Sequence, residues 1–324
     1  MSDGRKIPVL GYGTYLVSKN IRVPISSELL IPFKVPKDQM KTNILTALQT
    51  GYRSIDCAFF YDNEDAVGEA LAEAMDKLKV KREDIFVTSK VWPTHMRPEN
   101  VRKSCEQSLK DLRLAYLDLY LIHWPVAFQP SESHFPMAED GETYALDSVP
   151  LLDTWRAMEK LVDDGLVKSI GISNFNRRQI DHILNNCRIK PVNLQIEIHA
   201  NFPNEKLVNY AHSRGLTVSA FSPLRFLRGT SGETNLLEQP WMKTIAERHK
   251  KTPAQVLLRY LIQRHIVVQP KSSMPSRIKE NAQIFDFTLS DEEMKILNTK
   301  GVNKRQVTSL GMRYHPEYPF YDEY

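Results

Sequence analysis

Four residues in the sequence could carry out proton transfer together: Asp56, Tyr61, Lys90 and His123. Asp56 lies in an apolar run, and a buried carboxylate is costly unless it is paired. Lys90, on the next predicted strand, can form that pair. The charge of Lys90 would favour the phenolate of Tyr61 and lower a pKa that is ordinarily about 10. We therefore expect Tyr61 to act as a general acid, with His123 orienting a carbonyl oxygen.

Each of these residues also has an ordinary structural explanation when it is taken alone. Asp56 could be a satisfied core carboxylate, and Lys90 could extend out of its strand toward water. His123 could be a packed histidine, and Tyr61 could be a loop aromatic. It is the combination of the four that favours a catalytic site.

Short apolar runs alternate with helical patterns along the chain and predict an α/β fold. We expect strands at 53–58, 84–91, 117–124, 167–173, 192–199, 216–222, 265–270 and 285–288. Strands that alternate with helices pair in parallel, and near-continuous apolar runs indicate burial on both faces. Eight such units predict a (β/α)8 TIM barrel, with an open doubly wound sheet as the alternative.

Polar residues gather near the C-terminal ends of the predicted strands. They are Asp56, Lys90, His123, Ser173, Asn174, Gln195, Glu197, Ser222 and Lys271. In a barrel these strand ends meet at one mouth, where active sites are built. The pattern therefore predicts one shared site.

Composition excludes several other classes of function. The net charge of +4 is not concentrated in a basic tract, so no nucleic-acid partner is expected. No run approaches 18 apolar residues, so no membrane span is expected, and the start of the chain lacks the apolar core of a secretory signal. Three scattered cysteines suit neither a disulfide framework nor a metal cage. We expect a cytoplasmic protein without a metal.

Eight motifs, in this order, resemble those of the aldo-keto reductase superfamily, and most of all its aldose and aldehyde reductase branch. They are LGYGTY, GYRSIDCAFFYDNE, FVTSKVW, DLYLIHWP, VKSIGISNFN, AFSPL, PKSSMPSRIKEN and HPEYPFYDEY. The resemblance implies one barrel domain over residues 1–324, with an N-terminal β-hairpin and long loops at the C-terminal face. It also implies a monomer that acts on small-molecule carbonyl substrates.

The same resemblance implies NADPH/NADP+ as cofactor, with Asp56, Tyr61, Lys90 and His123 as the catalytic residues. The matching cofactor positions are Thr14, Tyr15, Asp56, Ser173, Asn174, Gln195, Phe221, Ser222, Leu224, Lys271, Ser272, Ser273, Arg277, Glu280 and Asn281. Lys271 and Arg277 match the surroundings of the 2′-phosphate, which favours NADPH over NADH. A histidine at 123, where double-bond reductases of the family carry glutamate, implies carbonyl reduction with Tyr61 as proton donor.

The resemblance places the substrate against Tyr15, Tyr61, Trp92, His123, Trp124 and Phe128. The chain departs from the family pattern at its loops. Residues 17–37 form an insertion that we expect near the pocket rim. The segment 225–235 looks shorter than the loop that covers the cofactor, and Arg225 or Arg228 could contact the pyrophosphate instead. The C-terminal segment 301–324 matches a substrate loop.

Two other functions fit parts of the sequence. A cofactor-binding sensor or a structural protein, such as a crystallin or a channel subunit, could use the same fold. A class I aldolase could form a Schiff base through Lys90 or Lys271. A lysine paired with Asp56 stays protonated and is a poor nucleophile, which argues against the aldolase.

Overall fold

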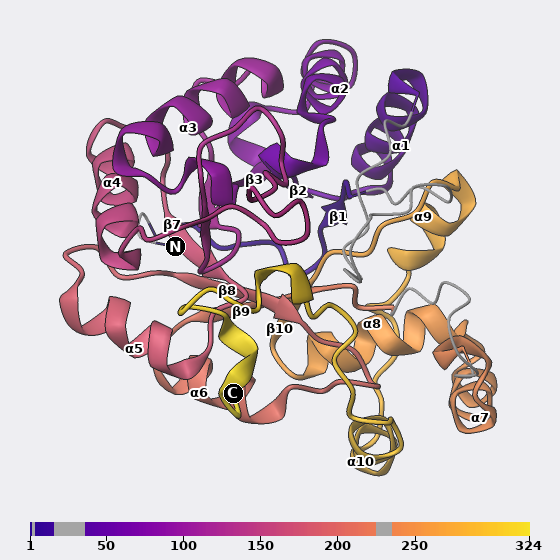
Figure 1. The fold of residues 1–324 in the computed structure, drawn as a ribbon. Helices are drawn as coiled ribbons and strands as arrows, with labels where there is room; N and C mark the ends of the chain where they lie inside the picture. Colours follow the sequence, from indigo (N-terminus) through magenta and orange to yellow (C-terminus); the bar gives the residue numbers. More distant parts are fainter. Residues whose placement is uncertain (2–3, 16–35, 225–234) are drawn as a thin grey trace.

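Eight parallel strands form the central sheet in the computed structural model, which describes residues 1, 4–15, 36–224 and 235–324. In sheet order they are β1 (Tyr12–Gly13), β2 (Ser54–Asp56), β3 (Phe86–Val91), β4 (Leu119–Ile122), β7 (Ile170–Ser173), β8 (Asn193–Glu197), β9 (Thr217–Phe221) and β10 (Ile266–Val268). A parallel bridge between Leu10 and Val268 joins the two ends of this order. The predicted (β/α)8 barrel is confirmed (Figure 1).

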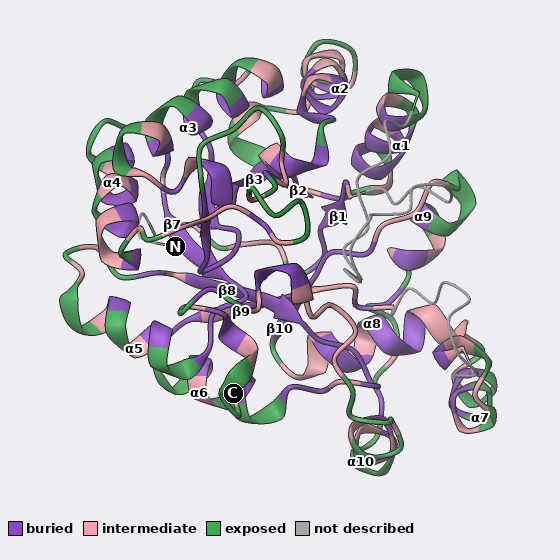
Figure 2. Cartoon of the chain, in the orientation of Figure 1, coloured by how far each residue is buried: buried purple, intermediate pink, exposed green. Residues whose placement is uncertain are grey.

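Helices surround the strands and present their buried sides to them (Figure 2). They are α1 (Lys37–Thr50), α2 (Glu64–Lys77), α3 (Pro98–Leu112), α4 (Leu151–Asp163), α5 (Arg177–Asn186), α6 (Glu205–Ser213), α7 (Pro240–His249), α8 (Pro253–Gln263), α9 (Pro275–Asn281) and α10 (Asp291–Thr299). In α3, Val101, Cys105, Leu109 and Leu112 are buried at three- and four-residue spacing, as expected for one apolar stripe. Capping boxes begin α5, α8 and α10.

The eighth strand is not the predicted one. Residues 285–288 lie between α9 and α10 without strand structure, and Phe285 is exposed. The place is taken by β1, whose two residues are too few to show any periodicity. The position of β1 depends on a close contact with the backbone that follows β10. A Cβ at Gly13 would come 2.8 Å from the carbonyl oxygen of Gln269. Only glycine allows this approach.

The predicted N-terminal β-hairpin is also wrong for the described residues. Residues 4–15 form no antiparallel pair, and Pro8 has no N–H to offer one. Instead Met1 and Ile7 pack against Phe86, Leu119 and Leu121, at the end of the barrel opposite the mouth. The segment therefore covers the bottom of the barrel.

Long loops do occur at the mouth. The connection after β4 contains a two-stranded antiparallel pair, β5 (Ala127–Phe128) and β6 (Leu146–Asp147). Most of the predicted insertion at 17–37 and of the segment 225–235, with Arg225 and Arg228, lies outside the described residues. No helix among those described is long and apolar enough to cross a membrane.

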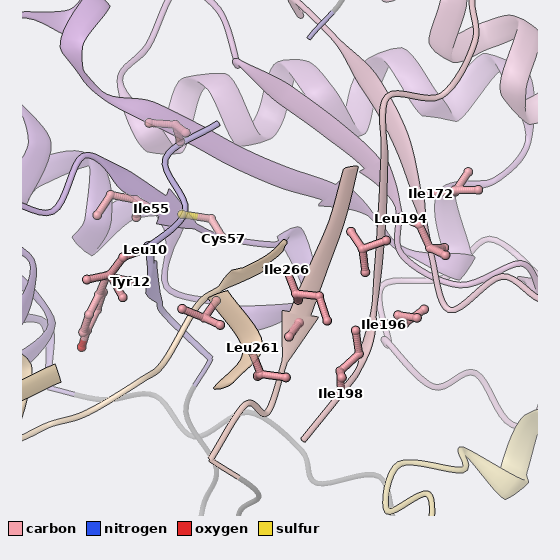
Figure 3. Packing of buried hydrophobic residues seen from close by; sticks show 14 of the residues in the cluster. Leu10, Tyr12, Ile55, Cys57, Ile172, Leu194, Ile196, Ile198, Leu261 and Ile266 are labelled. Atoms are coloured by element: carbon pink, nitrogen blue, oxygen red, sulfur yellow. The ribbon is translucent and has the colours of Figure 1, made fainter. Parts of the chain in front are cut away.

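Branched apolar side chains from the strands fill the core (Figure 3). Ile55, Ile172, Leu194, Ile196 and Ile266 are all nearly or fully buried in one cluster. Each such side chain contributes roughly 1.5–3 kcal/mol when it is fully removed from water. This packing fixes the strands, and with them the polar residues at their C-terminal ends.

Candidate active site

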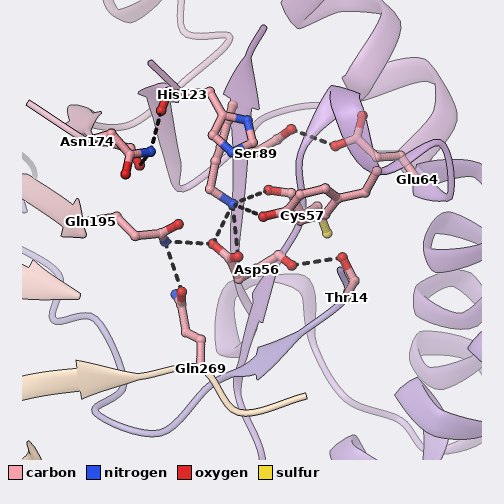
Figure 4. A network of polar contacts seen from close by, with 12 residues as sticks. Thr14, Asp56, Cys57, Glu64, Ser89, His123, Asn174, Gln195 and Gln269 are labelled. Atoms are coloured by element: carbon pink, nitrogen blue, oxygen red, sulfur yellow. Dashed lines mark hydrogen bonds and ion pairs between the residues drawn. The ribbon is translucent and has the colours of Figure 1, made fainter. Parts of the chain in front are cut away.

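A buried ion pair lies at the centre of the mouth (Figure 4). Lys90 Nζ donates to both carboxylate oxygens of Asp56, each at 2.9 Å, and to the carbonyl oxygen of Cys57 at 2.7 Å. Asp56 pairs in register with Thr88, and Lys90 follows two residues later on the same face of β3. The parallel register therefore brings the two charges together, and no part of the Lys90 side chain is exposed.

Tyr61 lies directly beside this pair. A short 3₁₀ turn, Phe59–Tyr61, follows β2 and holds Tyr61 Oη at 3.3 Å from Lys90 Nζ. The pKa of Tyr61 is raised well above its usual value, first by burial and then by the negative charge of Asp56. The expectation that Lys90 lowers this pKa is wrong for this structure, because burial of the phenol and the nearby negative charge of Asp56 both act in the opposite direction. Tyr61 is a protonated phenol at neutral pH.

His123 follows β4 and faces the same space. Its backbone N–H donates to the carbonyl oxygen of Val91, and its ring lies 5.9 Å from that of Tyr61 between centroids. Burial, followed by the charge of Lys90, lowers the pKa of His123 well below its usual value. The imidazole is therefore neutral at physiological pH. It can donate or accept a hydrogen bond, but it carries no charge to compete with Lys90.

A chain of amides connects the ion pair to the far side of the barrel. Gln195 Nε2 donates to Asp56 Oδ1 and to Gln269 Oε1, both at 2.9 Å. Thr14 is fully buried, and its hydroxyl donates to the carbonyl oxygen of Asp56 at 2.9 Å. The sequence reasoning missed Gln269. It could have been found, because it ends the seventh predicted strand as a polar residue, like the others.

Asn174 reaches the site from the end of β7. Its Nδ2 donates to the carbonyl oxygen of His123 at 3.0 Å and to Ser173 Oγ at 3.2 Å. Several polar atoms around the mouth are buried without a hydrogen-bond partner among the described residues, among them Asn174 Oδ1, Gln269 Nε2 and His123 Nδ1. Buried polar groups are rarely left in this state, and at a mouth they indicate a place for a polar ligand.

The remaining predicted cofactor residues lie along one side of the mouth, away from the catalytic four. Phe221 ends β9 half-buried, and Ser222 and Leu224 follow it, Ser222 with a φ of 51°. Lys271, Ser272 and Ser273 connect β10 to α9, on which Arg277, Glu280 and Asn281 lie. Tyr12 Oη donates to the carbonyl oxygen of Ser272 at 2.6 Å, which fixes this connection to β1.

The basic residues of that connection are available to an anion. Among the described residues, Lys271 Nζ donates to Ser273 Oγ alone, at 2.8 Å, and burial lowers the pKa of Lys271 to about 8. Arg277 is exposed and has no ion-pair partner in the part of the chain that the structure describes. Glu280, by contrast, accepts a hydrogen bond from Thr252 Oγ1 at 2.8 Å.

The predicted substrate residues meet in one aromatic cluster. Trp92, Trp124 and Phe128 are buried in it with Tyr61, and Tyr15 packs against them. Sequence reasoning missed Phe60, whose ring stacks on that of Trp92 at 3.9 Å. The signal was present, since Phe60 directly precedes Tyr61 in the motif. The cluster provides an apolar wall beside Tyr61 and His123.

Comparison with known proteins identifies the family of the chain. A model of the aldo/keto reductase family matches residues 32–301. The zebrafish (Danio rerio) aldo-keto reductase family 1 member A1-A is 44% identical over 337 positions, covering 100% of this chain and 98% of that protein. Rabbit (Oryctolagus cuniculus) prostaglandin-E(2) 9-reductase is also 44% identical, covering 100% and 97%.

A solved structure is similar along the whole chain. The aldose reductase of Schistosoma japonicum is 55% identical with a TM-score of 0.89, covering 99% of this chain and 98% of that one. Fold, site and relatives together define an oxidoreductase built on a (β/α)8 barrel. The chain belongs to the aldo/keto reductase family, and it is an enzyme of the aldose reductase type.

Proposed function

We propose that this enzyme reduces aldehydes and ketones to alcohols with NADPH, and that Tyr61 donates the proton. The observation that carries the proposal is the position of Tyr61 Oη, 3.3 Å from a lysine that is itself paired with Asp56. The raised pKa of Tyr61 keeps its proton available, and the lowered pKa of His123 keeps that residue from being the acid.

The residues of the chain then have separate tasks. His123 hydrogen-bonds the carbonyl oxygen and orients it beside Tyr61. Tyr61 transfers its proton to the oxygen as negative charge develops there, and Lys90 stabilises the phenolate that remains. Asp56 holds Lys90 in place through two hydrogen bonds. The bound cofactor supplies the hydride for the carbonyl carbon.

The mouth fits a nicotinamide cofactor, the type used in this family. Asn174 Oδ1 and Gln269 Nε2 offer an unpaired acceptor and an unpaired donor, which suit a carboxamide. Ser173, Asn174 and Gln195 are the residues expected to hold it, and Phe221 offers a ring face for stacking. The half-buried Lys271 and the exposed Arg277 support NADPH over NADH, since both can reach a phosphate.

The aromatic cluster favours substrates with apolar bodies, and we expect the C-terminal segment 301–324 to contribute to their selection. The insertion at 17–37 is a second expected contribution to selection. We further propose that the enzyme is a cytoplasmic monomer with one domain over residues 1–324.

The test combines purified enzyme and NADPH with a panel from small aldehydes and aldoses to steroid and quinone ketones, following the loss of reduced-nicotinamide absorbance. Turnover that falls roughly a hundred- to ten-thousand-fold in Tyr61→Phe supports the proposal. Tight NADPH binding without turnover of any substrate would instead favour the sensor or structural function.

Cofactor choice has its own test, based on the pKa of Lys271 at about 8. Phosphate binding favours the charged ammonium, so the affinity for NADPH should fall as the pH rises above about 8, while the affinity for NADH should not. Isothermal titration with both cofactors at pH 7 and pH 9 measures this difference. An affinity for NADPH that is the same at pH 7 and pH 9 would contradict the assignment of Lys271 to the phosphate.

A further inference from the structure

The sixth strand of the barrel order, β8, carries a second inward polar residue. β8 ends in Glu197, two residues after Gln195 and therefore on the same face of the strand, one step nearer the mouth. Glu197 is fully buried, and so is His199, whose Nε2 lies 2.9 Å from Glu197 Oε1. This carboxylate plays no part in the proton transfer proposed above, so it needs another explanation.

The other partners of Glu197 belong to the C-terminal segment. The backbone N–H of Gln306 donates to Glu197 Oε1 and that of Val307 to Oε2, both at 2.8 Å. Despite burial, these donors and His199 together lower the pKa of Glu197, so the group stays ionised at neutral pH. Hydrogen bonds to an ionised acceptor are about twice as strong as neutral ones.

The same stretch is held beside Glu197 by contacts with the residues that follow β8. The backbone N–H of Lys304 donates to the carbonyl oxygen of Asn201 at 2.8 Å. The guanidinium of Arg305 lies 4.6 Å from the ring centre of Phe202 and 3.8 Å from that of Phe320. Residues 304–307 therefore form a docked stretch, and Glu197 supplies an ionised acceptor to it.

The docked stretch leads directly to the aromatic wall of the site. The Val307 side chain packs against the cluster that contains Tyr61, Trp92 and Trp124. From the same C-terminal segment, the ring of Phe320 lies 5.8 Å from that of Trp124. The hydrogen bond from the Val307 backbone therefore connects Glu197 to a side chain at the wall.

We propose that Glu197 is a positioning residue that sets which carbonyl substrates the enzyme accepts, by fixing residues 306–307 against the aromatic cluster. The inference rests on the proposed carbonyl reduction. It concerns bulky apolar substrates, whose bodies extend past Tyr61 and His123 to the wall. A small aldehyde, which reaches only the catalytic residues, does not depend on Glu197.

The test compares Glu197→Gln with Glu293→Gln in the full-length enzyme with NADPH. Glu293 is a matched control: it is buried, bonded to His249 at 2.9 Å and to the backbone N–H of Ser290, but it caps α10 rather than the C-terminal segment. KM and kcat are measured for propanal and for a polycyclic aromatic ketone, and NADPH affinity is measured by fluorescence.

In Glu197→Gln we expect the KM for the ketone to rise roughly tenfold, the effect of losing one charge-assisted hydrogen bond. The kcat for propanal and the affinity for NADPH should stay within about twofold. Glu293→Gln should leave both substrates unaffected. An equal change for both substrates, or none, in a folded Glu197→Gln would overturn the inference.

A second measurement does not need turnover. Loss of the anchor should expose the bonds after Lys304 and Arg305, so trypsin should cleave there faster in Glu197→Gln than in Glu293→Gln. Equal cleavage of the two variants would refute the anchor directly. If the wild-type enzyme reduces no carbonyl but trypsin still cleaves Glu197→Gln faster than Glu293→Gln, the anchor is supported and the proposed function is refuted.

Discussion

Two buried aspartates at opposite ends of the barrel have different partners. Asp56 ends β2 at the mouth, and Asp118 precedes β4 at the bottom. Asp118 binds Arg5, Arg82 and the backbone N–H of Val87, and both arginines remain partly exposed. Asp56 instead binds Lys90, which has no exposed surface and points at Tyr61.

The comparison shows what separates a structural carboxylate from a catalytic one. The contacts of Asp118 join the N-terminal segment to β3 and β4, so their loss should affect stability. Those of Asp56 converge on one phenol, in a region where several other polar atoms have no partner among the described residues. Burial of the charge is common to both sites, so burial alone does not identify the catalytic end.

The largest effect is expected when the pair at the mouth is broken. Lys90→Met leaves Asp56 buried without its cation, which should lower the free energy of unfolding by about 3–5 kcal/mol. Carbonyl reduction should fall roughly a hundred- to ten-thousand-fold, because the phenolate of Tyr61 loses its charged neighbour. Urea denaturation and single-turnover kinetics measure the two effects.

The double variant Asp56→Leu/Lys90→Met is the control for this experiment. Replacing both charges with apolar groups should restore most of the stability without restoring activity. Recovery of activity along with stability would show that the pair only holds the fold, as Asp118 does.

Glu64 extends the comparison to a buried carboxylate that has no ion-pair partner among the described residues. It begins α2, is 5% exposed, and accepts a hydrogen bond from Ser89 Oγ at 2.6 Å. Burial raises its pKa to about 7. Because the folded protein holds this proton more tightly than the unfolded chain, the contribution of Glu64 to stability is fully present below about pH 4.5 and is lost as the pH rises through 7.

This pH-dependent contribution should amount to roughly 3 kcal/mol between pH 4.5 and pH 8. Glu64→Gln should remove it, since glutamine keeps a hydrogen-bonding group and cannot ionise. Denaturation at a series of pH values in both proteins measures the difference. Parallel curves for the two proteins would contradict the assignment.

At the bottom of the barrel, Asp118→Asn should affect stability alone. The variant loses its ion pairs with Arg5 and Arg82, which costs about 2 kcal/mol because both arginines can still reach water. The kcat for a small aldehyde should stay within about twofold. A tenfold loss of kcat at constant KM would show that the two ends of the barrel are coupled.

The sequence predicted the mouth better than the bottom, for a physical reason. Parallel strands end together, so the polar residues Asp56, Lys90 and His123 could be assigned to one place from their order alone. β1 could not be predicted, because two residues have no periodicity and Gly13 is required only by the backbone of Gln269. The pKa of Tyr61 was predicted in the wrong direction because the burial of its side chain depends on packing that no local pattern encodes.

The smallest effect on stability and activity is expected at Gln269, which could be structural like Asp118 or part of the site like Asp56. Its Oε1 accepts from Gln195 Nε2 at 2.9 Å, while its own Nε2 has no partner among the described residues. Gln269→Leu removes one neutral hydrogen bond, so the free energy of unfolding should fall by about 1 kcal/mol. If Gln269 serves the site, NADPH affinity should also fall, by roughly three- to tenfold, because Gln195 loses one of the two acceptors that orient it. A loss of stability with unchanged NADPH affinity would place Gln269 with Asp118, as a residue that holds the barrel and leaves the chemistry to Asp56 and its neighbours.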